Sequence, residues 1–127
     1  MYKTFVEMPV WQKAMDLAVN IFEMTERLPK KEDFGLTSQV RRSALSVSAN
    51  IAESFGREHT LDKLNFYYHA RGSLSETRSH LIYGHCVKYF SDNECNKVGG
   101  LLADIWKDIN TIIKSFRSKV TKPQPWP

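Results

Sequence analysis

The sequence predicts an all-α protein, an antiparallel four-helix bundle in up-down-up-down order. Apolar residues recur at alternating spacings of three and four over four long segments, as they do on one face of a helix. No segment alternates apolar and polar residues as a half-buried strand would. The connections between the helical segments are short, which favours antiparallel neighbours. A chain of 127 residues is long enough to form one domain of this kind.

The first helix is expected to begin near Pro9, a residue suited to a first turn, and to run to Leu28, where a proline ends it. Its predicted core residues share one face and are Trp11, Ala14, Ala18, Ile21, Thr25 and Leu28. The segment PKKEDFGL that follows is expected to form a tight turn at Phe34 and Gly35. Phe34 and Leu36 are predicted to cover the end of the bundle.

The second helix is expected from Thr37 to about Phe55, with Gly56 ending it in a left-handed conformation. Its core face recurs at spacings of four, three and four and consists of Val40, Ala44, Val47 and Ile51, extended by Phe55. The roughly opposite face is polar and consists of Gln39, Arg42, Ser46, Asn50, Glu53 and Arg57. A solvated face does not need this mixture of residues. The pattern therefore predicts a helix with two contact faces.

The third helix is expected from Leu61 to about Tyr89, capped by Thr60 or a neighbour. Its predicted core residues are Leu64, Tyr67, Ala70, Leu74, Thr77, Leu81 and Gly84. Gly72 and Gly84 lie inside this helix, where glycine costs about 1 kcal/mol relative to alanine. We therefore expect tight packing against a neighbouring helix at these two positions.

The fourth helix is expected to begin at a capping box formed by Ser91 and Glu94. Its predicted core residues are Cys95, Val98, Leu102, Ile105, Ile109, Ile112 and Phe116. Further apolar residues fall off the predicted core faces of the first and fourth helices: Val10, Leu17, Phe22, Leu101, Trp106 and Ile113. If exposed, they would form a patch larger than most soluble monomers tolerate, which predicts a homo-oligomer. The alternative is a wider core face.

The positive charge of the chain lies at its C-terminal end. Residues 1–113 contain fourteen basic and fourteen acidic side chains, and the residues that follow add Lys114, Arg117, Lys119 and Lys122 without any acid. We therefore divide the chain into a bundle domain at 1–119 and a basic, proline-rich tail at 120–127. The tail could neutralise phosphates. The alternative is a solvated helix end followed by a polyproline-like extension.

Cysteine content and hydropathy predict a cytoplasmic protein. Cys86 and Cys95 flank the turn around Ser91, so a disulfide is conceivable, but two cysteines do not make a disulfide framework and reduced thiols are expected. The chain has no apolar run of about 18 residues, which a membrane span needs. Its first residues lack the apolar core of a signal peptide.

The sequence favours no enzymatic activity, metal or cofactor. His80 and His85 are five residues apart, and the four histidines do not form a ligand cluster. The residues three before each histidine are not glutamates, which excludes the Glu-x-x-His pairs of di-iron bundles. No phosphate-binding glycine loop, nucleophile elbow or zinc motif is present.

The run TSQVRRSALSVSANIAESFGR, together with the preceding LPKKEDFGL, resembles the four-helix bundle proteins encoded in intervening sequences of bacterial 23S rRNA genes. The motif residues are Phe34 to Gln39, Arg41, Arg42, Asn50 to Glu53, and Arg57. The segment ARGSLSE, residues 70–76, is also similar to the family pattern. Ser43 and Ser54 stand where alanine and glycine are expected. Both are small, so close packing is preserved.

The resemblance implies a closed ring, a homopentamer with a central channel, and no established catalytic role. Relatives similar in fold act as accessory factors of diversity-generating retroelements, where they associate with a reverse transcriptase and its RNA template. Binding of RNA, DNA or a ribonucleoprotein is therefore the leading functional hypothesis, by analogy. The alternative is a protein-interaction scaffold without nucleic-acid binding.

Residues that could contact nucleic acid are arginines of the second helix and cations near the C-terminus: Arg41, Arg42, Arg57, Lys114, Arg117, Lys119 and Lys122. A guanidinium suits phosphate, but it also suits a carboxylate within the bundle. A structural polar network is predicted for Gln39, Asn50 and Glu53, because amides and carboxylates held against another helix need partners. The aromatic run at residues 66–68 could stack on bases or pack between subunits.

Overall fold

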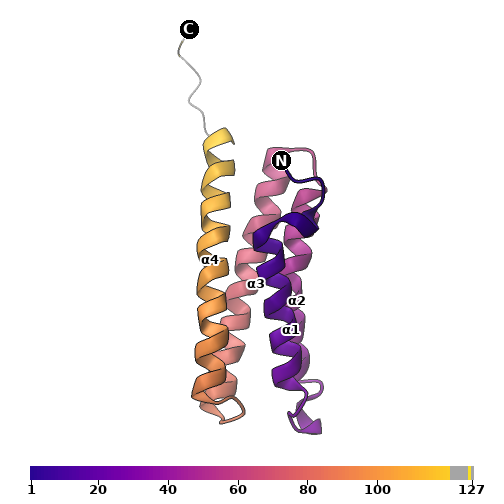
Figure 1. Cartoon of the computed structure of the whole chain (residues 1–127), viewed down its shortest axis with the longest axis vertical. Coiled ribbons are helices and arrows are strands. Elements are labelled where there is room, and N and C mark those ends of the chain that lie inside the picture. The colour runs from indigo at the N-terminus through magenta and orange to yellow at the C-terminus, as the bar shows by residue number, and fades with distance from the viewer. Residues whose placement is uncertain (121–125, 127) are drawn as a thin grey trace.

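The protein is a four-helix bundle in the computed structural model, which describes residues 1–120 and Trp126. The helices are α1 (Pro9–Thr25), α2 (Leu36–Phe55), α3 (Thr60–Cys86) and α4 (Asp92–Val120). Short 3-10 helices, η1 (Phe5–Glu7) and η2 (Lys30–Glu32), precede α1 and α2. The helices run up-down-up-down, so the N-terminus and the end of α4 lie at the same end of the molecule (Figure 1). The predicted fold class is confirmed.

Each helix packs against two others. Contacts join α1 to α2, α2 to α3, α3 to α4, and α4 back to α1, so α1 and α3 lie diagonally across the bundle. In Figure 1, α4 runs beside α3 along almost the full height of the bundle. Within the described residues, no helix is both long and apolar enough to cross a membrane.

The core faces of α2 and α3 agree with their predicted spacing. Val40, Ala44, Val47 and Ile51 are fully buried on α2, and Phe55 is half-buried. All seven residues predicted for α3 are buried. Tyr67 is the largest of the fully buried side chains, and burial raises the pKa of its hydroxyl to about 12.

The predicted core faces of α1 and α4 were partly wrong. On α1 the buried residues are Val10, Ala14, Leu17, Ile21, Met24 and Thr25. Trp11 and Ala18 are only half-buried, as is Leu28, which lies beyond the end of the helix. Because α1 packs against both α2 and α4, its buried set also includes residues outside the regular series. On α4 the buried positions continue at intervals of four, through Ile105, Ile109 and Ile113. The predicted Cys95, Ile112 and Phe116 are half-buried. Part of the off-face apolar set, including Val10 and Leu17, therefore belongs to a wider core.

Several helix ends differ from the prediction. Helix α1 ends at Thr25 rather than Leu28, and α3 ends at Cys86 rather than Tyr89. Gly56 follows α2 with φ −77°, so it is not left-handed as expected. Lys88 instead adopts φ 69° in the turn after α3. His59 precedes α3 without a side-chain cap, so Thr60 does not serve as one.

The capping box before α4 is confirmed. The Ser91 backbone N–H donates to Glu94 Oε1 at 2.9 Å, and the Glu94 N–H donates to Ser91 Oγ at 3.2 Å. Arg27 Nη2 also donates to Glu94 Oε1, at 2.6 Å. This hydrogen bond is the main reason that the pKa of Glu94 lies below its ordinary value.

The turn before α2 presents Phe34 to solvent, contrary to the expectation that it covers the bundle. Phe34 is 97% exposed, whereas Leu36 is buried. Glu32 Oε1 accepts a hydrogen bond from the Leu36 N–H at 3.2 Å, and Tyr89 Oη donates to Glu32 Oε2 at 2.9 Å. This end of the core is instead closed by Phe90, which is buried beside Leu36 and Gly84.

The two interior glycines of α3 differ in their surroundings. A Cβ at Gly84 would collide with the ring of Phe90, so glycine is required there for close packing, as predicted. A Cβ at Gly72 would meet no atom within 4 Å. The expectation of tight packing at Gly72 was therefore wrong within a single chain.

Candidate functional site

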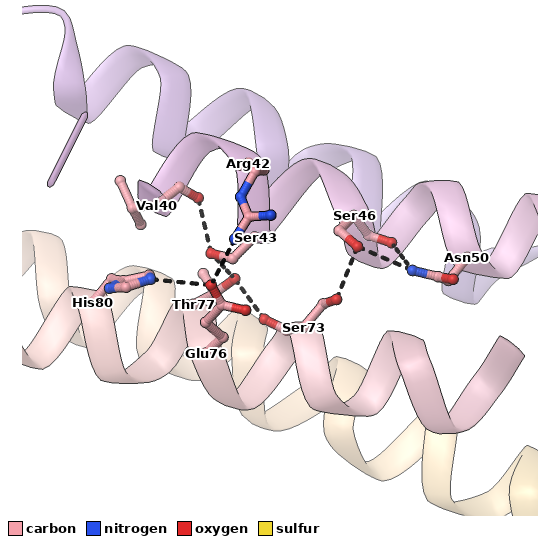
Figure 2. Close-up of polar contacts among 9 residues, drawn as sticks. All are labelled: Val40, Arg42, Ser43, Ser46, Asn50, Ser73, Glu76, Thr77 and His80. Atoms are coloured by element: carbon pink, nitrogen blue, oxygen red, sulfur yellow. Dashed lines mark hydrogen bonds and ion pairs between the residues drawn. The ribbon is translucent and has the colours of Figure 1, made fainter. Parts of the chain in front are cut away.

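A seam of small polar side chains joins α2 to α3. Thr77 Oγ1 lies 2.9 Å from Ser43 Oγ, and Ser73 Oγ donates to Ser46 Oγ at 2.9 Å (Figure 2). Asn50 Nδ2 donates to the Ser46 carbonyl oxygen at 2.8 Å. Because each hydroxyl finds its partner on the facing helix or on its own backbone, the two helices approach closely without leaving these groups unpaired.

A charged cluster lies at the solvent-facing side of this seam. The carboxylate of Glu76 lies 3.7 Å from Arg42 Nη2 and 3.4 Å from His80 Nε2 (Figure 2). Arg42 keeps 72% of its side chain exposed. An ion pair of this length at an exposed site contributes little to stability. The Arg42 guanidinium is therefore accessible to a ligand.

Arg41, although adjacent to Arg42, is held against α1 and keeps a third of its side chain exposed. Its Nε donates to Thr25 Oγ1 at 2.7 Å, and its Nη2 lies 3.3 Å from the Phe22 carbonyl oxygen and from Glu26 Oε1. Its guanidinium also stacks over the Phe22 ring at 4.4 Å. The sequence left phosphate and carboxylate open as partners, and the structure places this arginine in contacts between α1 and α2.

Arg57, the third arginine of the predicted set, is partly engaged. Its Nε lies 3.7 Å from Glu53 Oε2, and its guanidinium lies 4.8 Å from the centre of the Phe66 ring. Both contacts are local and half-exposed, so they leave some of its donors open to solvent.

The predicted polar network is not continuous within one chain. Asn50 bonds to Ser46 within α2, and Glu53 pairs with Arg57. Gln39 is exposed and, in the part of the chain that the structure describes, makes no hydrogen bond or ion pair through its side chain. These residues do not bond to one another here, and their role at a subunit boundary stays a prediction.

Three of the four cations predicted near the C-terminus lie on the last turns of α4. Lys114 is exposed and has no ion pair within residues 1–120. Lys119 Nζ lies 5.5 Å from the centre of the Phe116 ring. Arg117 is exposed on the last turns of α4. Lys122 lies outside the described residues.

The aromatic run at residues 66–68 divides between core and surface. Tyr67 is buried against Phe116, with ring centres 5.7 Å apart, while Phe66 and Tyr68 are half-buried. Tyr68 lies under the guanidinium of Arg71, at 5.3 Å from its ring centre. The two half-buried rings therefore already have cationic partners within the chain.

Sequence reasoning missed three contacts between helices. Lys13 of α1 pairs with Asp108 and Asp104 of α4, at 2.8 and 3.1 Å, and these hydrogen bonds raise the pKa of the lysine. Arg71 of α3 donates to Asn110 of α4 at 2.9 Å. Asp104 and Asp108 are four residues apart on one face of α4, a pattern that indicates a cation on a facing helix. The sequence does not show which helix faces them.

The structure also contains an apolar groove that the sequence did not reveal. It lies between α3 and α4 with a volume of about 520 Å³. Its lining consists of Leu74, Ser75, Arg78, Leu81, Ile82, His85, Cys95, Gly99, Leu102, Ala103 and Trp106. Ile82 and Trp106 are about half exposed, and Trp106 is one of the apolar residues that the sequence placed off the core face of the fourth helix.

Three of the four histidines lie on α3, and His59 precedes it. His85 Nε2 lies 2.6 Å from Asp92 Oδ1, and His80 contacts Glu76. Among the described residues, no group of three or more histidine, cysteine, aspartate or glutamate side chains is placed to hold a metal ion.

Comparison with known proteins gives a match over most of the chain. Residues 6–111 match the family described as the 23S rRNA-intervening sequence protein. Among solved structures, the chain is similar to a crystal structure of a protein with unknown function from the S23 ribosomal protein family of Bacteroides thetaiotaomicron. That likeness has a TM-score of 0.75 and 24% sequence identity, covers 83% of this chain and 98% of that chain, and supports the fold. No curated protein matches the sequence.

Proposed function

We propose, from the premise that this chain belongs to the 23S rRNA-intervening sequence protein family, that it is a non-catalytic, self-associating bundle that binds nucleic acid or a ribonucleoprotein. The contact surface in this proposal is the basic end of α4. The observation that carries the proposal is the distribution of charge along the chain. The formal net charge of +4 equals the contribution of the four basic residues that follow Ile113, with no acidic residue among them.

The structure of α4 favours this surface for phosphate binding. Lys107 and Lys114 are two turns apart on the side of the helix opposite Ile109 and Ile113, and both are exposed. The nearest acids on α4 are Asp104 and Asp108, whose charge is partly compensated by Lys13. No acidic residue follows Asp108 in α4, so the positive charge at the end of this helix is not offset by carboxylates of α4 itself.

Of the arginines on α2, Arg42 is the best additional phosphate contact. It is mostly exposed and paired only at 3.7 Å, whereas Arg41 would have to leave its partners on α1. Arg57 is intermediate, because its ion pair with Glu53 is long and exposed. We therefore rank Arg42 and Arg57 after the end of α4.

Self-association is supported by apolar side chains that a single chain leaves exposed. Phe22 on α1, Ile82 on α3 and Trp106 on α4 are among them. A ring of five copies remains the expectation from the family resemblance. A reverse transcriptase bound to its RNA template is the partner that the same resemblance suggests.

A protein-interaction scaffold without nucleic-acid binding is the second candidate function. The observation that favours it is the apolar groove between α3 and α4, which suits a protein segment better than a phosphate. The two functions differ in their response to salt. Phosphate binding weakens steeply as ionic strength rises, whereas an apolar contact does not.

The test is binding of a short single-stranded RNA and of its duplex over a salt series. The variant Lys114→Ala/Lys119→Ala removes two cations from the end of α4. The matched control Lys30→Ala/Lys31→Ala removes the same charge from the opposite end of the bundle. The mass of the assembly is measured for each protein, so that a loss of binding can be separated from a loss of assembly.

Binding through α4 predicts weaker RNA affinity for the first variant than for the control. The slope of log affinity against log salt should fall by about 0.7 to 0.9 for each phosphate that the variant no longer neutralises. If RNA affinity falls equally in both variants, binding depends on the overall charge of the protein and not on the end of α4. If wild-type protein does not bind either RNA at low salt, the nucleic-acid proposal is wrong and the scaffold function remains.

A further inference from the structure

Two apolar features are uncovered in a single chain: the α3–α4 groove and the indole of Trp126. The groove has a volume of about 520 Å³, within the range of sites that bind ligands or side-chain anchors. Trp126 is 94% exposed. A tryptophan side chain buries roughly 150–250 Å² when it finds a partner, so an exposed indole is a strong candidate for an anchor.

Gly99 and Ala103 leave open space on the α4 side of the groove, between the larger side chains of that helix. A Cβ at Gly99 would meet no atom within 4 Å, so nothing from the bundle fills the space above this residue. Ala103, one turn later, and Ser75 on α3 also line the groove with short side chains. Glycine in a helix costs about 1 kcal/mol, and at Gly99 the fold of one chain does not require it.

The walls of the groove suit an aromatic ring. Leu81, Ile82, Leu102 and Trp106 supply apolar surface. Arg78 lines the groove and has no ion pair or hydrogen-bonded partner for its side chain among residues 1–120, so its guanidinium is available to stack on an indole.

The sequence after Val120 has the chemistry that such a groove binds. It reads TKPQPWP, which places Trp126 between two prolines. Proline-rich segments lose little conformational entropy on binding and dock in grooves lined by aromatic residues. The segment has no acidic residue that would have to be desolvated against the apolar walls.

A copy cannot place this segment deep in its own groove. Cys95, at the far end of the groove, lies roughly 38 Å from Val120 along the α4 axis at 1.5 Å per residue. Gln124 lies at most about 14 Å beyond Val120 even in a fully extended chain. The far end of the groove can therefore be reached only by the segment of another copy.

We propose that residues 121–127 of one copy dock in the α3–α4 groove of a neighbouring copy, with Trp126 as the anchor. The exchange of this segment links adjacent copies in the assembly. This inference rests on the self-association in the proposed function, and it goes beyond it by naming the segment and the groove that meet.

The test is disulfide trapping between the segment and the groove. Cys95 already lines the groove, and Cys86→Ser removes the other thiol. Gln124→Cys places a thiol two residues before Trp126, which is kept. Burial raises the pKa of Cys95, so oxidation is carried out at mildly alkaline pH. Products are separated under non-reducing conditions and the linked peptides are identified by mass spectrometry.

Two kinds of control accompany this protein. Trp126→Ala removes the anchor and should abolish the disulfide between Cys95 and the introduced thiol. Gly99→Leu adds a side chain within the groove at a position where a Cβ meets no atom within 4 Å, and Gly100→Leu adds the same side chain at an equally open position outside the lining. The substitution at Gly99 should abolish the disulfide, and the one at Gly100 should leave it unchanged. Native mass spectrometry reports the assembly of every variant.

The expected result is a disulfide between copies that joins Cys95 to the introduced thiol and disappears in Trp126→Ala and in Gly99→Leu. A disulfide within one copy, or an assembly in which this disulfide does not form, would overturn the inference and leave self-association intact. If Gly99→Leu loses assembly and Trp126→Ala does not, another part of the neighbouring copy occupies the groove and the inference is wrong. A wild-type monomer would instead contradict the self-association on which the inference rests.

Discussion

Arg41 Nε donates a hydrogen bond of 2.7 Å to Thr25 Oγ1, and the same guanidinium lies over the Phe22 ring. Thr25 Oγ1 is itself 2.7 Å from the Ile21 carbonyl oxygen, so the contact ties the last turn of α1 to α2. The next residue, Arg42, faces solvent and a distant carboxylate. Two adjacent arginines of the family motif therefore have different physical roles: Arg41 joins α2 to α1, and Arg42 is mostly exposed to solvent.

Replacing Arg41 should destabilise the protein much more than replacing Arg42. Arg41→Ala leaves the buried Thr25 hydroxyl without its cationic donor and should lower the free energy of unfolding by about 1–2 kcal/mol. Arg42→Ala should change it by less than about 0.5 kcal/mol, because its ion pair is long and exposed. Urea denaturation followed by circular dichroism measures both. Equal losses would contradict the separate roles.

Gly84→Ala should destabilise the bundle although alanine favours helix formation. The added methyl group would meet the Phe90 ring, and overpacking of this kind costs about 1–3 kcal/mol. The matched substitution Gly72→Ala meets no neighbour and should stabilise the helix by up to about 1 kcal/mol. Thermal unfolding of the two variants tests the contrast. A stable Gly84→Ala protein would mean that Phe90 moves aside easily.

The α2–α3 seam should show coupling between its hydroxyl groups. Thr77→Val leaves the buried Ser43 hydroxyl without its partner on α3 and should cost about 1–2 kcal/mol. Adding Ser43→Ala should cost less than it does in the wild-type background, since the hydroxyl that had lost its partner is then removed. A double-mutant cycle on the free energy of unfolding measures this coupling. Strictly additive losses would show that the two hydroxyls act independently.

The capping box of α4 should make the free energy of unfolding depend on pH in the acidic range. The pKa of Glu94 is lowered in the folded protein by Arg27, so its contribution is present above the ordinary carboxyl pKa and is lost as pH falls through the folded value. Glu94→Gln should therefore cost about 1 kcal/mol near neutral pH, and the difference from wild type should shrink in acid. Glu58→Gln is the control, because the Glu58 side chain is exposed and has no partner among the described residues. Urea titrations over a pH series provide the measurement, and a pH-independent difference at Glu94 would contradict the role of its charge.

The prediction from sequence was most accurate where a helix has one dominant buried face. All seven positions predicted for α3 and the four regularly spaced positions of α2 are buried. The resemblance drawn from the Phe34–Arg57 motif and residues 70–76 is confirmed by the family match over residues 6–111. The capping box at Ser91 and Glu94 was also confirmed, since its two hydrogen bonds involve residues only three apart.

The prediction was weaker where residues far apart in the sequence decide the outcome. Helix α1 packs against both α2 and α4, so its buried face is wider than one regular series, and Leu17 was assigned to the wrong set. Phe34 was expected to cover the bundle, but the space is occupied by Phe90 from the turn after α3. The partners of Arg41 lie on α1 and just after it, more than a dozen positions earlier in the chain.

The sequence by itself determined the helix class, the approximate helix boundaries, the separation of charge toward the C-terminus and the family. These properties depend on residues within a few helical turns of each other, where spacing fixes geometry. Only the tertiary structure decided which arginine is tied to α1, why Gly84 must be glycine, and that Gly99 and Ala103 leave a groove between α3 and α4. Those properties depend on which side chains of separate helices meet. Helical periodicity predicts that a face is buried, but it does not predict which residues pack against that face.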